Sequence, residues 1–367
     1  MFHRESGYFK TTYGADMALY PLPIAQWSVA VLAVLFLLLP LVTTELFGAR
    51  NAEYYVTNVN FILIAIVGAL GLNILVGYTG QISIGHAAFM SVGAYTAANL
   101  AKFGLPFWVT LPAGGLMAAA IGVVVGIPSL RIKGLYLAIA TLAAQLIIEW
   151  IINHVPAISG GSQASIEVPR PTVFGFTLSA QRELYYFLLF FAVASIVLTL
   201  NLVRSRIGRA FIAIRDQDIA AEIIGINIFR YKLTAFAISS FYAGVTGVLY
   251  TYYYGVANYE NFQITTSIDY LAMIIIGGQG SVLGSIFGAT FVSLLPTAIR
   301  EFMQYFGTMQ IFGMQLFTEA ELNNVIPAMR LTVFGLLIII FLVLEPEGLN
   351  RLWRNIRSYF RVWPFSY

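Results

Sequence analysis

The chain has 367 residues, of which 59% are hydrophobic and only 10% are charged. In a soluble domain, roughly a quarter of all residues are charged, and these residues cover much of its surface. The composition therefore excludes a soluble globular protein and predicts an all-α protein that crosses a membrane many times. The sequence has no cysteine, which excludes disulfides and thiolate metal sites. The formal net charge of +3 gives no sign of nucleic-acid binding.

Apolar runs of about 20 residues, the length that crosses a bilayer core of roughly 30 Å, give the predicted spans. Residues 1–24 come first and lack the short apolar core and cleavage site of a signal peptide. The clear runs then follow in chain order at 25–44, 57–78, 107–127, 135–153, 184–203, 233–254 and 329–345.

Two further apolar regions are interrupted by glycine. One covers about 84–102 and follows "GYTGQISIGHAAF", and the other covers 267–299 and is split by "GGQGSVLGS". The second region is too long for one ordinary crossing, and glycine disfavours a continuous helix there. We therefore expect two shorter segments in 267–299, either full crossings or a re-entrant pair. The total is about ten membrane segments, some of them short or broken.

The two glycine-rich stretches share a short pattern. "GQISIG" (80–85) and "GQGSVLG" (278–284) both contain Gly-Gln-x-Ser with a glycine soon after, which is compatible with coincidence or with internal duplication. Unwound backbone at membrane depth is tolerated only where it is buried in protein or lines a cavity. The candidate residues for a substrate path are Gly80, Gln81, Ser83, Gly85, His86, Gly278, Gln279 and Ser281. The alternatives are close packing of helices through small residues and a purely structural, hydrogen-bonded His86.

The loop at 204–232 sets the predicted orientation, because basic loops stay on the cytoplasmic side. Its basic residues are Arg204, Arg206, Arg209, Arg215, Arg230 and Lys232. The C-terminal tail, 350–367, carries Arg351, Arg354, Arg357 and Arg361 and is placed on the same side. An even number of crossings then places residues 1–24 in the cytoplasm as well. Residues 25–349 form the predicted membrane domain, and its loops 154–183 and 300–328 are predicted to be exterior.

Enzymatic chemistry finds no support in the sequence. The three histidines, His3, His86 and His154, are scattered, and no nucleotide-binding G-x-x-x-x-G-K-[ST] motif occurs. We therefore expect no catalytic site, no bound metal and no cofactor, so that any energy from ATP must come from another subunit. The spans are nearly free of ionisable groups, which argues against a proton- or ion-coupled carrier.

"RDQDIAAEIIGIN" (215–227) is a polar stretch between membrane-length runs. It predicts a short helix, with Asp216 and Asp218 in the first turn where they suit the helix dipole. Ile219, Ile223 and Ile224 fall on one face, Ala220 and Ala221 allow close approach, and Gly225 is suited to end the helix. Two turns of helix are not stable alone in water, so something must cover the isoleucine face. That cover is either the membrane domain itself or a cytoplasmic partner.

The chain resembles the permease subunits of bacterial ABC importers for branched-chain amino acids, specifically the longer of the two permeases of Leu/Ile/Val systems. The resemblance covers roughly 59–349. Its motifs are "GLNILVGYTGQISIGHAAFMSVGAYTAA", "LRIKGLYLAIATLA", "SGGSQ", "VPRPTVFG", "SRIGRAFIAIRDQDIAAEIIGINIFRYKLTAFAIS", "AGVTGVLY", "IIIGGQGSVLGSIFGA" and "LEPEGL".

This resemblance implies a permease fold in a bacterial inner membrane. It also implies four kinds of partner: a second, homologous permease, two cytoplasmic ATPase subunits, an exterior substrate-binding protein and membrane lipid. The short cytoplasmic helix would carry motion from the ATPases, and an arginine at Ala221 would displace them. The residues that the resemblance assigns to this coupling are Arg209, Arg215, Asp216, Ala220, Ala221 and Gly225.

The implied function is import of branched-chain or other apolar amino acids by alternating access. One alternative is a related permease for urea or short-chain amides. Another is a stand-alone channel or secondary carrier, which would need no ATPase.

Overall fold

The computed structural model describes residues 11–12, 23–130, 135–160, 165–173, 175–307, 310–311, 314–315, 332–341, 343 and 348–362. The chain divides into two compact units. Residues 58–350 form one unit, and residues 1–57 with 351–367 form the other. Most of the predicted N-terminal segment 1–24 lies outside the described residues.

The all-α membrane fold is confirmed. Six of the described helices are long and apolar enough to cross a membrane: Glu53–Tyr78, Phe107–Ser129, Tyr136–His154, Gln181–Arg204, Ile228–Tyr254 and Val282–Phe302. A shorter apolar helix, Thr332–Phe341, lies within the predicted run 329–345. The predicted count of about ten membrane segments is approximate, and it includes both these six helices and the shorter ones.

The first two predicted spans belong to one element. α2 (Pro23–Asn73) runs through 25–44 and on into 57–78 without a break, and a π-helix, η1 (Ile74–Tyr78), continues it. The two predicted spans are thus joined by helix rather than by a loop, and the second of them corresponds to the candidate span Glu53–Tyr78. Pro40 lies inside α2 and is tolerated there.

Both glycine-interrupted regions are divided as predicted. The chain leaves helical geometry after Thr79, and α3 (His86–Lys102) begins after the six intervening residues 80–85. α11 (Ile264–Gly277) and α12 (Val282–Gly307) are separated by residues 278–281. At 1.5 Å per residue, the 14 residues of α11 span only about 21 Å. α11 is therefore too short for a full crossing of a core of roughly 30 Å.

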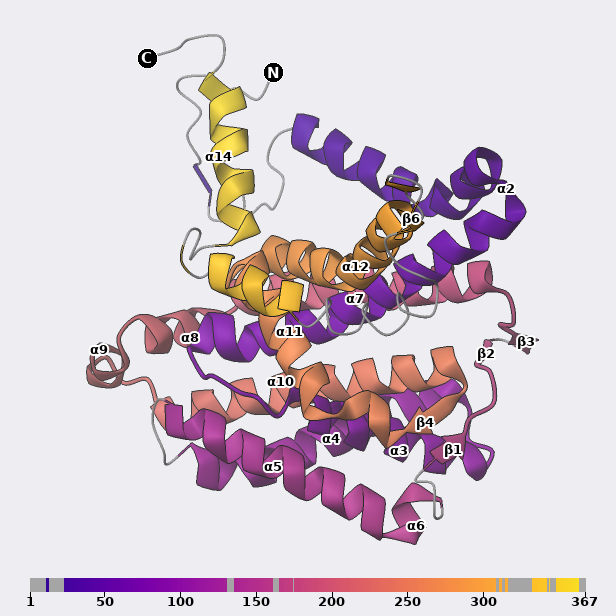
Figure 1. Cartoon of the computed structure of the whole chain (residues 1–367). Coiled ribbons are helices and arrows are strands. Elements are labelled where there is room, and N and C mark those ends of the chain that lie inside the picture. The colour runs from indigo at the N-terminus through magenta and orange to yellow at the C-terminus, as the bar shows by residue number, and fades with distance from the viewer. Residues whose placement is uncertain are drawn as a thin grey trace. The chain divides into compact units, whose positions relative to one another are not determined.

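α10 (Ile228–Tyr254) packs closely against α3 and α4 (Phe107–Ser129). Glycines make this approach possible: a Cβ on Gly247 would collide with the backbone of Met90, and one on Gly93 would collide with the backbone of Gly244. Small residues bring membrane helices together in this way. α5 (Leu135–His154) and α7 (Gln181–Arg204) run alongside this group (Figure 1).

The loop between α7 and α10 holds two helices rather than one. α8 covers Arg206–Asp216, and α9 covers Asp218–Ile223. Gln217 between them is extended, with φ −159° and ψ 98°. A single helix through 215–225 was therefore wrong, and Asp216 ends α8 instead of standing in the first turn of α9. Figure 1 shows α8 and α9 together at one end of the bundle.

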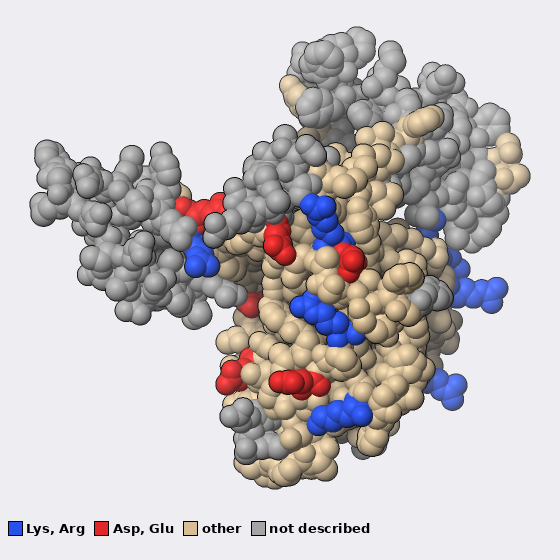
Figure 2. Space-filling view, turned by 90° about the vertical axis from the view of Figure 1, so that its right-hand side faces the viewer, with Lys and Arg blue, Asp and Glu red and all other residues tan. Residues whose placement is uncertain are grey.

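Short strands gather at the opposite end of the bundle, around the predicted exterior loop 154–183 (Figure 1). After the one-turn α6 (Pro156–Ser159), β1 (Ser165–Glu167) pairs antiparallel with β4 (Val256–Asn258), and β2 (Thr172–Val173) pairs with β3 (Phe176–Thr177). β4 leads into the 3-10 helix η2 (Tyr259–Phe262). The sequence did not predict these strands. Charged side chains of both signs are interspersed among neutral residues on this face (Figure 2).

The predicted exterior loop 300–328 lies largely outside the described residues. Its described part contains the end of α12 and the pair β5 (Gln310–Ile311) and β6 (Met314–Gln315). The predicted tail contains α14 (Leu349–Val362).

Candidate functional site

The two glycine breaks meet at the end of the bundle that carries α8. The amide of Asn73, directly before η1, joins them: its Nδ2 donates to the Ser281 carbonyl at 2.9 Å and to Ser285 Oγ at 2.7 Å. Its Oδ1 accepts from the Gly280 backbone N–H at 2.9 Å. Asn73 is fully buried. One side chain thus holds the chain between α11 and α12 against the end of the 57–78 span.

Gly77 allows this contact. A Cβ at Gly77 would collide with Asn73 Oδ1 and with the backbone nitrogen of Gly280. Both breaks also contain glycine in left-handed conformation, with φ +69° at Gly80, +113° at Gly278 and +73° at Gly280. Residues with a side chain rarely adopt these angles, so the geometry of the two breaks depends on glycine.

Arg215 connects α8 to the same place. Its Nη1 donates to the Gly77 carbonyl at 2.9 Å, and its Nε and Nη2 both reach Asp216 Oδ1 at 3.0 Å. The side chain also packs against the backbone of both breaks: a Cβ on Gly80 would lie 3.2 Å from Arg215 Cγ, and one on Gly280 would lie 2.6 Å from Arg215 Nη1. A residue in the polar loop therefore contacts both broken helices directly.

A second polar cluster surrounds the first turn of α3. The backbone N–H of Ala87 donates to Ser267 Oγ at 2.8 Å, and that of Ala88 donates to Gln145 Oε1 at 2.7 Å. Gln145 also donates to the Phe262 carbonyl at 2.9 Å and accepts from Ser267 Oγ at 3.2 Å. Gln145 lies in the middle of α5, so this cluster is well inside the bundle. The first N–H groups of a helix need such partners, and here they come from α5 and α11.

His86 starts α3 beside this cluster. Its ring hydrogen-bonds the Gly68 carbonyl and lies 5.2 Å from the ring of Tyr270. Its buried Nε2 has no partner within the described part of the chain. His86 is thus a hydrogen-bonded core residue with one ring nitrogen still available.

The other predicted path residues are divided between these two places. Gln81 is buried, and its Nε2 donates to Thr79 Oγ1 at 3.0 Å and to the Lys232 carbonyl at 3.3 Å. Ser83 is buried as well, and a Cβ on Gly85 would lie 2.6 Å from the Thr141 carbonyl of α5. Gln279 is exposed. Gly80 therefore lies at the junction beside Arg215, Ser281 is bonded there by Asn73, and Gly278 is in the same break as Ser281, whereas Gly85 and His86 belong to the deeper cluster.

The predicted isoleucine face of α9 is open to the surroundings. Ile219, Ile223 and Ile224 are 65%, 81% and 74% exposed. Ala221 is only 2% exposed and faces its own chain, so an arginine there would disturb local packing rather than test docking. Ala220 is exposed, as is Arg209, which donates to the Arg204 carbonyl at 2.9 Å.

Gly225 ends α9 as predicted. It has φ +90° and its N–H bonds the Glu222 carbonyl, while the N–H of Ile226 bonds the Ala221 carbonyl at 3.0 Å. These two bonds form a Schellman motif, which fixes the direction in which the chain leaves the helix.

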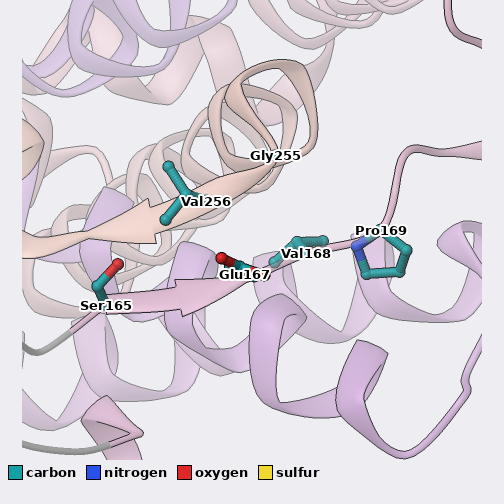
Figure 3. Close-up of a pocket in the computed structure, with 6 residues that line it drawn as sticks. All are labelled: Ser165, Glu167, Val168, Pro169, Gly255 and Val256. Atoms are coloured by element: carbon teal, nitrogen blue, oxygen red, sulfur yellow. The ribbon is translucent and has the colours of Figure 1, made fainter.

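A pocket of about 690 Å³ lies at the opposite end of the bundle, against the paired strands β1 and β4 (Figure 3). It is lined by Ser165, Glu167, Val168, Pro169, Gly255 and Val256. The N–H of Val168 bonds the Gly255 carbonyl at 2.9 Å, which extends the pairing of the two strands. The exposed Glu167 adds one carboxylate to an otherwise neutral lining.

Sequence reasoning missed the side chains that join the elements: Asn73, Gln145 and Ser267, together with Gly77 and Gly280. One signal was available, because an amide within an apolar span is costly unless it is hydrogen-bonded. Asn73 and Gln145 carry such amides within the predicted spans 57–78 and 135–153.

Comparison with known families and proteins gives a consistent picture. The family described as branched-chain amino acid transport system / permease component matches residues 54–342. The high-affinity branched-chain amino acid transport system permease protein LivM of Escherichia coli K12 is 36% identical over 267 residues, which cover 66% of this chain and 63% of LivM. The match thus spans less than two thirds of LivM.

More distant relatives belong to similar systems. The permease LivH of Escherichia coli K12 is 24% identical over 248 residues, covering 62% of this chain and 78% of LivH. The ribose import permease RbsC of Haemophilus influenzae is 23% identical over 293 residues, covering 76% and 85%. No solved structure matches the chain. The family match covers more than half of the sequence, and the chain belongs to the branched-chain amino acid transport system permease components.

Proposed function

We propose that the chain is a transmembrane subunit of an ATP-driven importer for branched-chain or other apolar amino acids. It has no catalytic site of its own in this proposal, and two cytoplasmic ATPase subunits supply the energy. A second, homologous permease completes the membrane path, and an exterior binding protein delivers the substrate. The protein lies in a bacterial inner membrane, with both termini and the loop 204–232 in the cytoplasm.

The observation that carries the proposal is the link from α9 to the glycine breaks. α9 presents exposed isoleucines at one end of the bundle. α8, next to it, sends Arg215 to the Gly77 carbonyl. An ATPase that binds the isoleucines and moves would therefore move Arg215 against both broken helices. A stand-alone channel or carrier gives this arrangement no role.

The proposed path follows from the same geometry. Residues 80–86 run from the junction beside Arg215 to the cluster around Gln145 and Ser267 deep in the bundle. Their polar groups are amides, hydroxyls, an imidazole and backbone, which can bind the zwitterionic end of an amino acid, while the apolar side chain contacts the surrounding helices. In this proposal, the pocket against the paired strands β1 and β4 lies on the exterior face, where the binding protein docks.

Isolation of the assembly tests the proposal. The tagged chain, purified in mild detergent from its native host, should bring with it a pair of ATPases and a second permease in fixed stoichiometry. Recovery of the chain alone, with full transport activity, would favour the channel or carrier alternative. Uptake competition then separates the substrates: leucine, isoleucine and valine should compete with one another, whereas urea and acetamide should not.

Replacement of Arg215 should uncouple the ATPases from the membrane path. Arg215→Gln removes the charged donor to Gly77, and a hydrogen bond from a charged group is worth roughly 1.5–3 kcal/mol, with the lower end expected for a partly exposed side chain. We expect uptake to fall about tenfold, as about 1.4 kcal/mol corresponds to a factor of ten, while the ATPases stay bound and continue to hydrolyse ATP.

Arg206→Gln is the matched control, because Arg206 is exposed at the first residue of α8, nine residues before Arg215. It should leave uptake close to normal. Loss of ATPase binding in Arg215→Gln, or equal losses of uptake in both variants, would contradict the role of Arg215 as the link.

A further inference from the structure

α14 (Leu349–Val362) has a composition that the importer function does not explain. Residues 351–367 contain four arginines and no aspartate or glutamate. Tryptophan, tyrosine and phenylalanine are interleaved with these arginines in "RLWRNIRSYFRVWPFSY". Such a segment has a strong positive charge together with a large apolar area.

The helix separates the two kinds of residue. Leu352, Trp353, Ile356 and Tyr359 recur at spacings of three and four residues and so share one face. All four are exposed, from 39% at Leu352 to 68% at Tyr359. Arg351, Arg354 and Ser358 fall on the other face and are exposed as well. Basic residues opposite an aromatic and aliphatic face are typical of a helix that lies in a membrane interface.

The start of α14 is fixed at the end of the bundle. Gly348, directly before it, has φ +67°, and a Cβ there would lie 2.6 Å from the Gly278 nitrogen and from the Ile276 carbonyl. α14 therefore begins beside the break between α11 and α12. That break contacts Arg215 of α8 and, through Asn73, the C-terminal part of the Glu53–Tyr78 helix, so it lies where the spans end.

We propose that α14 binds the anionic headgroups of the adjacent membrane surface, with its apolar face inserted among the upper parts of the lipid chains. The arginines supply the charge that anionic lipid attracts, and this attraction falls off within a Debye length of roughly 10 Å at 0.1 M salt. The residues that insert are Leu352, Trp353, Ile356 and Tyr359. This proposal concerns the chain alone and holds whether or not ATPases bind it.

The absence of cysteine makes a direct test possible. Ile356→Cys places a single thiol on the apolar face, and Ser358→Cys places one on the opposite face as the matched control. Each full-length variant is labelled with an environment-sensitive fluorophore and reconstituted in vesicles of phosphatidylcholine alone, or of equal parts phosphatidylcholine and phosphatidylglycerol.

The label at position 356 should emit at shorter wavelength, and be quenched by lipid-chain quenchers, in the vesicles that contain phosphatidylglycerol. The shift should be smaller in phosphatidylcholine and in high salt, and Arg351→Gln with Arg354→Gln should weaken the dependence on lipid charge, since Arg357 and Arg361 remain. The label at position 358 should remain in a water-like environment throughout.

Two results would overturn the proposal. Equal emission in both kinds of vesicle, unaffected by salt, would show that anionic lipid is not recognised. A label at position 356 that neither lipid-chain quenchers nor water-soluble quenchers reach would show that protein covers this face, either another segment of the chain or a second copy.

Discussion

Asn73→Leu should abolish uptake and destabilise the membrane domain. The leucine cannot accept from the Gly280 N–H or donate to Ser281 and Ser285, which are the three bonds that Asn73 makes. A buried backbone donor left without a partner costs roughly 1–3 kcal/mol. The chain between α11 and α12 would then lose its attachment to the 57–78 span, and motion of Arg215 would no longer reach both breaks together. Uptake into vesicles and the fraction of protein that remains monodisperse after heating measure the two effects.

Asn58→Leu is the matched control for this change. Asn58 lies in the same span and accepts one bond, from Thr297 Oγ1 at the long distance of 3.5 Å. It should change uptake and heat resistance little. Asn73→Asp separates the accepted bond from the donated ones. It keeps an oxygen that accepts from the Gly280 N–H but loses the bonds donated to Ser281 and Ser285. Normal uptake and normal heat resistance in Asn73→Leu would show that the amide does not hold the breaks together.

Ile223→Lys should remove the ATPases while leaving the fold intact. Ile223 is 81% exposed, and surface substitutions usually change the free energy of unfolding by less than about 0.5 kcal/mol. A cation at the last residue of α9 also suits the helix dipole, so the helix itself should persist. Loss of a central apolar anchor of an interface costs at least about 2 kcal/mol, and a buried unpaired charge adds to that cost. We expect no copurified ATPase and no ATP-dependent uptake.

Ile223→Leu is the control, since it keeps an apolar side chain of the same size on the same face. It should retain the ATPases. The heat resistance of the isolated chain should be the same for both variants and the native protein. Retention of the ATPases by Ile223→Lys would mean that the isoleucines of α9 are not the docking surface.

The sequence predicted those features that depend on a strong local signal. Long apolar runs located six spanning helices, and glycine in "GGQGSVLGS" divided 267–299 correctly into α11 and α12. Gly225 was identified as the end of α9 because few other residues accept φ +90°.

The failures depend on contacts between distant residues. Gln217 interrupts the helix between Arg215 and Asp218 with no proline or glycine at that position, so no local signal marks the break. β1 and β4 lie far apart in sequence and are too short to show an alternating pattern. The joining role of Asn73 depends on residues more than two hundred positions away, and only the folded chain brings them together.

Transport by defined components shows whether ATPases drive movement of substrate through this chain. The chain, its partner permease and the ATPases are reconstituted in liposomes, and uptake of labelled leucine delivered by the binding protein is measured with and without ATP. We expect uptake only when ATP and all the subunits are present, and none with Ile223→Lys. Uptake of leucine by this chain alone in liposomes without ATP would contradict this expectation.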